Sequence, residues 1–467
     1  MELSGRSVLV LGLGETGLSM AQWVARQGAA RVRVADTREA APRLGELRRS
    51  VPAAEFVAGP FADMLYDGAD LVAISPGLPL SEPTVRRAAS RGVPIVGDIE
   101  LFAQALSRDG RVKVIGVTGT NGKTTVTALT GALLAGAGLD IEVAGNIGPA
   151  ALAALMRRID RGLMPQVWVL ELSSFQLETT TSLECDAATV LNLSEDHLDR
   201  YASLDEYVAA KARIFAGGGV QVLNRDDPRS LRMALPGRDV LTFGLGAPEE
   251  PTDFGLLKVQ GELSLARGMT PLVALDDLRL AGLHNAANAL AALALAKTTG
   301  VNCAQMLPAL RAFTGLPHRL ERVAEVRGVT FYDDSKGTNV GSTVAALAGL
   351  AGTLNGAGAK VVLIAGGDGK GQEFAPLRDP LARSGRALVL IGRDAPIIGS
   401  AVAGSGVPIE HAASMEDAVA RAYGAASPGD AVLLSPACAS FDMFRNYKHR
   451  GEVFCAAVKE IARARPR

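Results

Sequence analysis

The chain has 467 residues, of which 48 are basic and 49 acidic, giving a formal net charge of −1 at pH 7. A chain of this length exceeds one ordinary hydrophobic core, so two or three domains are expected. The balanced charge argues against a nucleic-acid or membrane-surface partner. Glycines interrupt the early apolar run at 8–13, which indicates a buried strand and not a signal peptide. We therefore expect a cytoplasmic protein.

Short runs of β-branched residues alternate with Ala/Leu-rich helical stretches, a pattern typical of α/β layers with largely parallel sheets. Boundaries are indicated after residues 98–102 and at the Gly/Pro-containing segment 314–317. The expected domains are 1–101, 102–315 and 316–467. The predicted strands are Ser7–Leu11, Val32–Ala35, Leu71–Ile74, Val112–Val117, Val167–Leu170, Ala188–Leu191, Thr330–Tyr332, Val361–Ile364, Ala387–Ile391 and Ala431–Leu434.

A glycine-rich loop, Gly12-Leu-Gly14-Glu-Thr-Gly17, lies directly between the first predicted strand and a helical stretch. Asp36 follows at the end of the next strand, which completes the pattern of a dinucleotide-binding fingerprint. Glycines let a diphosphate approach the backbone, and the helix N-terminus supplies partial positive charge. By itself this loop fits NAD(P), another nucleotide, or merely a tight strand–helix turn.

A second loop, 118–125, has the sequence Thr-Gly-Thr-Asn-Gly-Lys-Thr-Thr and follows the predicted strand Val112–Val117. The strict P-loop pattern requires glycine at position 117, where this chain has valine. The remaining glycines, Lys123 and Thr124 still predict a loop that cradles phosphates and offers a hydroxyl to Mg²⁺. Glu171 ends another predicted strand and is a candidate Mg²⁺ ligand, the alternative being a solvated acid at a strand end.

Lysine is scarce, because only ten of the 48 basic residues are lysines. Lys211 lies in an Ala-rich helical stretch and is either an ordinary solvated lysine or a site residue. His197 lies between acidic residues after a strand, as a packed histidine or a metal or phosphate contact.

Three C-terminal loops, 334–339, 366–370 and 435–441, also follow strands and should converge at one sheet edge. The four cysteines, Cys185, Cys303, Cys438 and Cys455, lack metal-binding spacing and are expected to be free thiols.

These motifs, in this order, resemble those of the Mur ligases of peptidoglycan synthesis. The matching segments are Thr118–Thr125, Leu170–Glu178, Asn192–Arg200, Gly282–Ala292, Leu316–Arg319, Asp334–Thr343 and Ser435–Ser440. The resemblance spans the whole chain. It implies a Rossmann-like N-terminal domain for a UDP-linked substrate, a P-loop-like ATP-binding domain, and a Rossmann-like C-terminal domain for the amino acid. The implied reaction is ATP-dependent addition of D-glutamate to UDP-N-acetylmuramoyl-L-alanine through an acyl phosphate, with two Mg²⁺ ions, by a monomer.

The resemblance also implies roles for individual residues. Catalytic roles fall to Lys123, His197, Lys211 and Lys336. ATP contacts fall to Gly119, Thr120, Asn121, Gly122, Lys123, Thr124, Thr125, Asn285, Asn288, Arg319 and Asp334. Contacts to the UDP-linked substrate fall to Thr16, Asp36, Thr37, Arg38, Gly77, Asn146 and His197. D-Glutamate contacts fall to Thr338, Lys370, Ser440, Phe441 and Tyr447. Metal ligands are Thr124, Glu171, His197 and Lys211, the last as a carbamate.

Two residues differ from the family pattern, and three other kinds of protein would explain part of the sequence. Phe441 and Tyr447 stand where the family pattern has leucine and phenylalanine. An NAD-dependent dehydrogenase would explain the loop Gly12–Gly17 but not the second phosphate loop. A P-loop switch protein would leave the C-terminal lysine-bearing loops unexplained. Within the superfamily, another Mur ligase or an amide ligase like folylpolyglutamate synthetase is the alternative, but the synthetase gives no reason for the uridine-type loop Gly12–Gly17.

Overall fold

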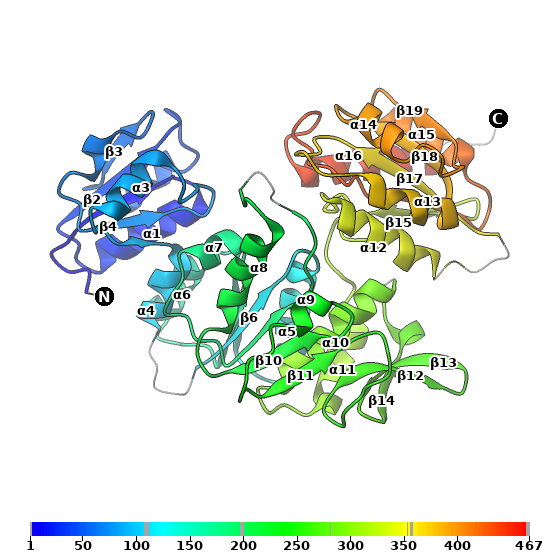
Figure 1. The fold of residues 1–467 in the computed structure, drawn as a ribbon, viewed down its shortest axis with the longest axis horizontal. Helices are drawn as coiled ribbons and strands as arrows, with labels where there is room; N and C mark the ends of the chain where they lie inside the picture. The colour runs from blue at the N-terminus through cyan, green and yellow to red at the C-terminus, as the bar shows by residue number, and fades with distance from the viewer. Residues whose placement is uncertain are drawn as a thin grey trace. The chain divides into compact units, whose positions relative to one another are not determined.

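The computed structural model describes residues 2–106, 112–196, 200–280, 282–352, 354 and 358–463. The chain forms two compact units. One comprises Met1–Leu193, Asp205–Phe243 and Ala291–Met306, and the other comprises Ser194–Leu204, Gly244–Leu290 and Leu307–Arg467. Three sheets flanked by helices give the mixed α/β architecture that the sequence predicted (Figure 1).

The N-terminal sheet has five parallel strands in the order β3-β2-β1-β4-β5. Its strands are β1 (Ser7–Leu11), β2 (Arg31–Asp36), β3 (Glu55–Ala58), β4 (Leu71–Ile74) and β5 (Ile95–Val96). Its helices are α1 (Glu15–Arg26), α2 (Leu44–Ser50), α3 (Pro83–Ser90) and α4 (Asp98–Ala105). Alternate residues Leu9 and Leu11 of β1 pack with Val85 and Ala88 of α3, because successive strand residues point to opposite faces.

The central sheet has nine strands in the order β14-β13-β12-β11-β10-β9-β6-β8-β7. Its first six strands are β6 (Lys113–Thr118), β7 (Ile141–Gly145), β8 (Val167–Glu171), β9 (Ala187–Val190), β10 (Val220–Asn224) and β11 (Val240–Phe243). Antiparallel hairpins join β12 (Phe254–Val259), β13 (Glu262–Arg267) and β14 (Thr270–Ala274). The helices used below are α5 (Lys123–Gly136), α6 (Ala151–Asp160), α7 (Ser174–Glu178), α8 (Leu204–Ala212), α10 (Leu283–Lys297) and α11 (Cys303–Ala312). The parallel strand β6 lies between β8 and β9, so the segments that follow these three strands leave the sheet at one edge.

The C-terminal sheet has six strands in the order β15-β16-β20-β17-β18-β19, and all are parallel except β15. They are β15 (Glu321–Val326), β16 (Val329–Asp333), β17 (Val361–Gly366), β18 (Gly385–Ile391), β19 (Ile409–His411) and β20 (Ala431–Leu434). The helices are α12 (Val340–Ala351), α13 (Arg378–Ser384), α14 (Ala395–Ala401), α15 (Met415–Ala425) and α16 (Tyr447–Arg463). Leu363 packs with residues of α12, α13 and α14, whereas its neighbours Val362 and Ile364 pack with residues of α15 and α16. This two-sided burial explains the continuous apolar run of β17.

Each predicted strand coincides with an observed one, and Ser7–Leu11, Leu71–Ile74 and Ala431–Leu434 match in both bounds. All four cysteines are free thiols, with Cys455 only partly buried. Within the described ranges, no helix is both long enough and apolar enough to cross a membrane.

Candidate active site

The loop Gly12–Gly17 connects β1 to α1 and forms the floor of a cavity of about 500 Å³. A Cβ added to Gly17 would lie 1.8 Å from the carbonyl oxygen of Gly12, so the tight turn excludes any side chain there. The residues that line the cavity include Thr16, Asp36, Thr37, Arg38 and Gly77, five of those predicted to hold the UDP-linked substrate. The structure therefore brings these five residues together.

Asp36 forms hydrogen bonds to the glycine-rich loop and to Arg38, two parts of the chain at this cavity. Its Oδ2 accepts a hydrogen bond from the amide of Leu13 at 2.7 Å, and both carboxylate oxygens accept from the Arg38 guanidinium at 2.8 Å. These bonds, with that from Arg38 the largest cause, lower the pKa of Asp36 from 3.8 to about 2. The carboxylate is almost fully buried whereas the Arg38 side chain is 55% exposed, so Arg38 presents its charge at the rim.

The phosphate loop follows β6 and ends at the first residue of α5, Lys123. Gly122 has a φ of 82°, a conformation that glycine adopts without strain. The Nζ of Lys123 donates to the carbonyl oxygens of Gly119 at 2.9 Å and Thr120 at 2.8 Å. Thr124 and Thr125 lie in the first turn of α5, and their contacts to phosphate and Mg²⁺ stay predictions. The loop thus gathers its amides, a cation and hydroxyl groups at one helix N-terminus.

Glu171 ends β8 directly beside this loop, because Val117 of β6 pairs with Glu171. Its side chain is 1% exposed, and Oε1 accepts a hydrogen bond from the Asn146 amide at 2.6 Å. The other oxygen, Oε2, is buried without a hydrogen-bond partner among the described residues. A buried carboxylate oxygen left over in this way suits a divalent cation, which prefers oxygen ligands. His197, another of the four predicted metal ligands, lies outside the described residues.

Lys211 lies on α8 and is buried, with only 1% of its surface exposed. Its Nζ donates to the carbonyl oxygen of Gly119 at 2.9 Å and lies 3.3 Å from the Thr118 hydroxyl. The side chain therefore points at the start of the phosphate loop. The solvated-lysine alternative is wrong for this position, while the carbamate stays a prediction.

Two side chains at this loop were not predicted as site residues. Asn192 follows β9, and its Oδ1 accepts from the Asn121 amide at 2.8 Å while its amide donates to the Asn121 carbonyl at 3.1 Å. Tyr207 lies one helical turn before Lys211, with its hydroxyl 3.2 Å from that of Thr120 and its ring 4.7 Å below the Lys211 Nζ. The strand end and the four-residue helical spacing were the signals that could have identified them.

The three C-terminal loops lie together, as predicted. Asp333, Leu434 and Ile364 are level in neighbouring strands, so the following segments start at one edge. The Ser435 hydroxyl donates to Oδ2 of Asp334 at 2.7 Å, and two backbone hydrogen bonds of 2.8 and 3.0 Å join Asp368 to Ala439. The predicted contacts of this region differ in exposure. Ser440 is buried, Thr338 and Tyr447 are partly buried, Lys370 is exposed, and Phe441 is 74% exposed.

A second cavity, of about 380 Å³, lies at the segment that leads into the C-terminal sheet. Its lining includes Asn285 of α10, Arg319 and the ring-bearing Tyr332 of β16. The Asn288 amide donates to Oδ1 of Asn285 at 3.1 Å, which places three predicted ATP contacts in one neighbourhood. Tyr332 was not predicted as a site residue. It lines this cavity because strand β16 lies next to the segment 314–320. Lys123 belongs to the other compact unit.

The carboxyl group of Asp334 is expected to make the stability of the unliganded protein depend on pH. Burial of the carboxyl group raises its pKa from 3.8 to about 7. The folded state therefore holds this proton more tightly than the unfolded chain, and the free energy of unfolding falls as pH rises from about 4 through 7. We expect Asp334→Asn to stabilise the unliganded protein at pH 8, with little gain at pH 4. Urea denaturation of both proteins across this range would measure the difference, and a gain independent of pH would contradict the assignment.

The fold and these loops define a nucleotide-dependent enzyme of α/β architecture, and comparisons with known proteins identify its class. The MurD-like N-terminal domain of Mur ligases matches residues 6–97, the Mur ligase middle domain matches 117–296, and the Mur ligase glutamate ligase domain matches 318–438. The chain belongs to the Mur ligase family.

Relatives that match over nearly the whole chain share one name within this family. The UDP-N-acetylmuramoylalanine--D-glutamate ligase of Nitrosospira multiformis is 59% identical, covering 100% of this chain and 98% of the relative. The protein of that name from Nitrosomonas europaea is 54% identical over 99% and 98% of the two chains. Among solved structures, UDP-N-acetylmuramate-alanine ligase MurC from Thermotoga maritima aligns with a TM-score of 0.60 at 20% identity, covering 97% of this chain and 99% of that one. That similarity shows the shared fold.

Proposed function

We propose that this protein is an ATP-dependent ligase that joins D-glutamate to UDP-N-acetylmuramoyl-L-alanine in peptidoglycan precursor synthesis, acting as a monomer in the cytoplasm. The observation that carries the proposal is the 59% identity, over the entire chain, to a protein named for this reaction. The cavity above Gly12–Gly17 and the phosphate loop that follows β6 would hold two different nucleotides, which supports the proposal. An NAD-dependent dehydrogenase needs only one of them.

The chemistry explains why two phosphate sites are needed. A carboxylate resists attack by an amine, because its oxygen is a poor leaving group. Transfer of the terminal phosphoryl group of ATP to the carboxylate of the UDP-linked substrate gives ADP and an acyl phosphate. The amine of D-glutamate then attacks the acyl carbon, phosphate leaves, and the amine loses its proton. Lys123 would offset the repulsion between the carboxylate and the phosphates.

Mg²⁺ suits the residues at the phosphate loop. When bound, it neutralises charge on the phosphate oxygens. Thr124 and Glu171 would hold it, together with His197 and a carbamate on Lys211, in a site for two ions. The buried Oε2 of Glu171, which has no hydrogen-bond partner among the described residues, supports this role.

D-Glutamate would bind at the loops that follow β16, β17 and β20. Thr338, Lys370, Ser440, Phe441 and Tyr447 would contact it. Lys336, whose Nζ lies 4.3 Å from the centroid of the Tyr447 ring, would orient the acyl phosphate. The exposed positions of Phe441 and Lys370 support a site that receives a ligand from solvent.

Release of phosphate from ATP tests the proposal. The protein would be incubated with UDP-N-acetylmuramoyl-L-alanine, Mg²⁺ and each member of a panel of D- and L-amino acids. We expect release with D-glutamate and a product whose mass corresponds to the substrate plus one glutamyl residue. Activity with a different amino acid would instead support another ligase of the family, and no release with any of them would contradict the proposal.

The N-terminal cavity gives a separate prediction about nucleotide choice. We expect UMP and UDP-N-acetylmuramoyl-L-alanine to raise the melting temperature, because Thr16, Thr37 and Arg38 line the cavity with hydrogen-bonding groups. NADH should leave it unchanged. Thermal shift with the three compounds measures this, and stabilisation by NADH alone would show that the cavity is a dinucleotide site.

A further inference from the structure

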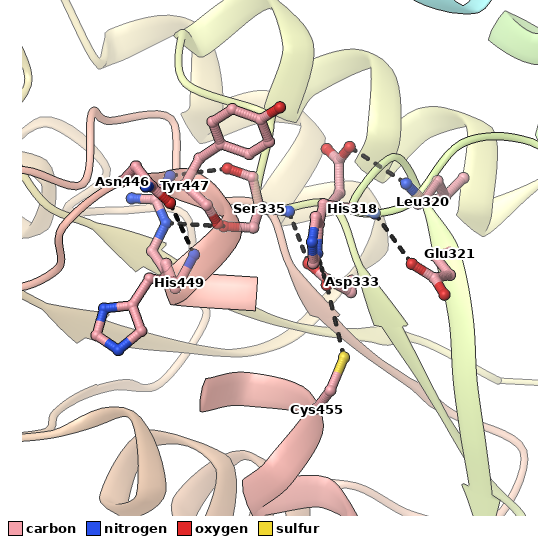
Figure 2. Close-up of polar contacts among 11 residues, drawn as sticks. His318, Leu320, Glu321, Asp333, Ser335, Asn446, Tyr447, His449 and Cys455 are labelled. Carbon is pink, nitrogen blue, oxygen red and sulfur yellow. Dashed lines mark hydrogen bonds and ion pairs between the residues drawn. The ribbon is translucent and has the colours of Figure 1, made fainter. Parts of the chain in front are cut away.

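His318 and Asp333 form a hydrogen-bonded pair at the entry to the C-terminal sheet (Figure 2). The Nδ1 of His318 lies 2.7 Å from Oδ2 of Asp333, and the imidazole is the donor because a carboxylate only accepts. Asp333 is fully buried, and the His318 side chain is 14% exposed. The thiol of Cys455 also donates to Oδ2, at 3.6 Å. No role of this pair follows from the proposed chemistry.

The pair connects two segments that carry predicted ATP contacts, Arg319 and Asp334. On one side, His318 precedes Arg319, and its carbonyl oxygen accepts from the amide of Lys336 at 3.1 Å. On the other side, Asp333 precedes Asp334, and its Oδ1 accepts from the Ser335 amide at 2.9 Å. The pair is therefore placed to control the separation of Arg319 and Asp334.

The backbone at His318 needs this support. His318 has a φ of 62°, in the left-handed region that non-glycine residues enter at a cost. Its amide donates to Oε2 of Glu321 at 3.0 Å, so hydrogen bonds from the ring, the amide and the carbonyl all hold one conformation. Such a conformation persists only where surrounding contacts over-determine it.

Gly451 of helix α16 leaves space for the His318–Asp333 pair. A Cβ added to Gly451 would lie 2.2 Å from Nδ1 of His318 and 2.7 Å from Oδ2 of Asp333. Any side chain at position 451 would therefore force the two groups to move. A glycine inside a helix lowers helix stability, so its presence here is explained by the pair that it accommodates.

A metal site is the competing interpretation, since ligand atoms of His318, Glu321 and Asp333 lie within 4.8 Å of one another. Two ligands of one tetrahedral ion, each about 2 Å from the metal, lie about 3.3 Å apart. The 2.7 Å between His318 and Asp333 is instead the length of a charge-assisted hydrogen bond. The geometry is that of a directly hydrogen-bonded pair.

We propose that His318 and Asp333 are positioning residues, which hold Arg319 and Asp334 at the separation that ATP binding requires. The inference rests on the proposed function. His318 and Asp333 themselves do not contact the substrate; they act through the backbone of their neighbours.

The test compares His318→Leu with His318→Asn. Leucine removes the donor and disfavours the left-handed backbone. Asparagine places an amide donor where Nδ1 lies and tolerates that backbone. We expect the leucine variant to raise KM for ATP at least ten-fold, with kcat and KM for the UDP-linked substrate changed less than three-fold. The asparagine variant should recover most of the loss. Equal increases in both KM values, or an asparagine variant as impaired as the leucine variant, would overturn the proposal.

Gly451→Ala tests the same pair without removing a polar group. It should raise KM for ATP in the same selective manner, because the new methyl group separates His318 from Asp333. Gly424→Ala, on α15, is the matched control, since a Cβ there lies within 4 Å of no atom in the part of the chain that the structure describes. An unchanged KM for ATP in Gly451→Ala would count against the pair.

Direct measurement of ATP binding separates this inference from the proposed function. If the wild-type protein binds ATP but forms no product, the proposed function fails, and dissociation constants still compare the variants. A dissociation constant for ATP that is the same in wild type, His318→Leu and His318→Asn would overturn the inference by itself. Amide exchange should also be faster at 333–338 in the leucine variant than in the asparagine variant, and equal exchange would contradict it.

Discussion

Replacing Lys211 with alanine is expected to reduce kcat by about 100-fold or more, which corresponds to roughly 3 kcal/mol of transition-state stabilisation. The Lys211 Nζ is buried and directed at Gly119 and Thr118 of the phosphate loop. An amine there adds positive charge beside the proposed Mg²⁺ site, whereas a carbamate would donate the oxygen ligands that Mg²⁺ prefers. Steady-state phosphate release would measure the loss.

Rescue by small carboxylates distinguishes a carbamate from an amine. Acetate or formate should partly restore Lys211→Ala, because either anion can occupy the vacated volume and supply oxygens. Lys211→Arg should be inactive and should not respond, since a guanidinium keeps its charge and fills the space. A carbamate forms from the neutral amine and CO₂, so wild-type activity should also increase when bicarbonate is added. An active Lys211→Arg enzyme would contradict the carbamate assignment.

Replacing Lys123 with alanine is expected to abolish measurable turnover, at a cost of about 2–4 kcal/mol or more. Lys123 begins α5 and bonds two carbonyl oxygens of its own loop, so its ammonium lies where phosphates would bind. Stabilisation by UDP-N-acetylmuramoyl-L-alanine should persist, because the cavity above Gly12–Gly17 contains no residue of this loop. Kinetics and thermal shift on the same preparation would check both expectations.

Lys258→Ala provides the matched control for Lys123→Ala, because Lys258 is an exposed lysine on β12. It should behave as wild type in both measurements. Near-wild-type kinetics in Lys123→Ala would show that the loop does not bind the transferred phosphate. Loss of the response to the UDP-linked substrate would instead indicate that the substitution damages the fold.

The sequence by itself determined the α/β class, the strand-end positions of the loops and the two glycine-rich segments. These features are local, since a buried parallel strand is an apolar run and a phosphate loop is a fixed pattern of glycines and a lysine. The unpredicted strands were mostly short or lie toward sheet edges, such as β3, β5 and β19. Their few residues give little periodicity, and pairing with a neighbour decides their conformation.

Only the tertiary structure decided which side chains meet. Asn192 and Tyr207 reach the phosphate loop because β9 lies beside β6 and because α8 packs its lysine face toward that loop. His318 contacts Asp333 because the segment before β15 lies next to the end of β16, and Gly451 of α16 leaves space for both side chains. No local pattern encodes such contacts between residues distant along the chain. Sheet order and the shape of the packed helices determine them, and these follow from the whole chain.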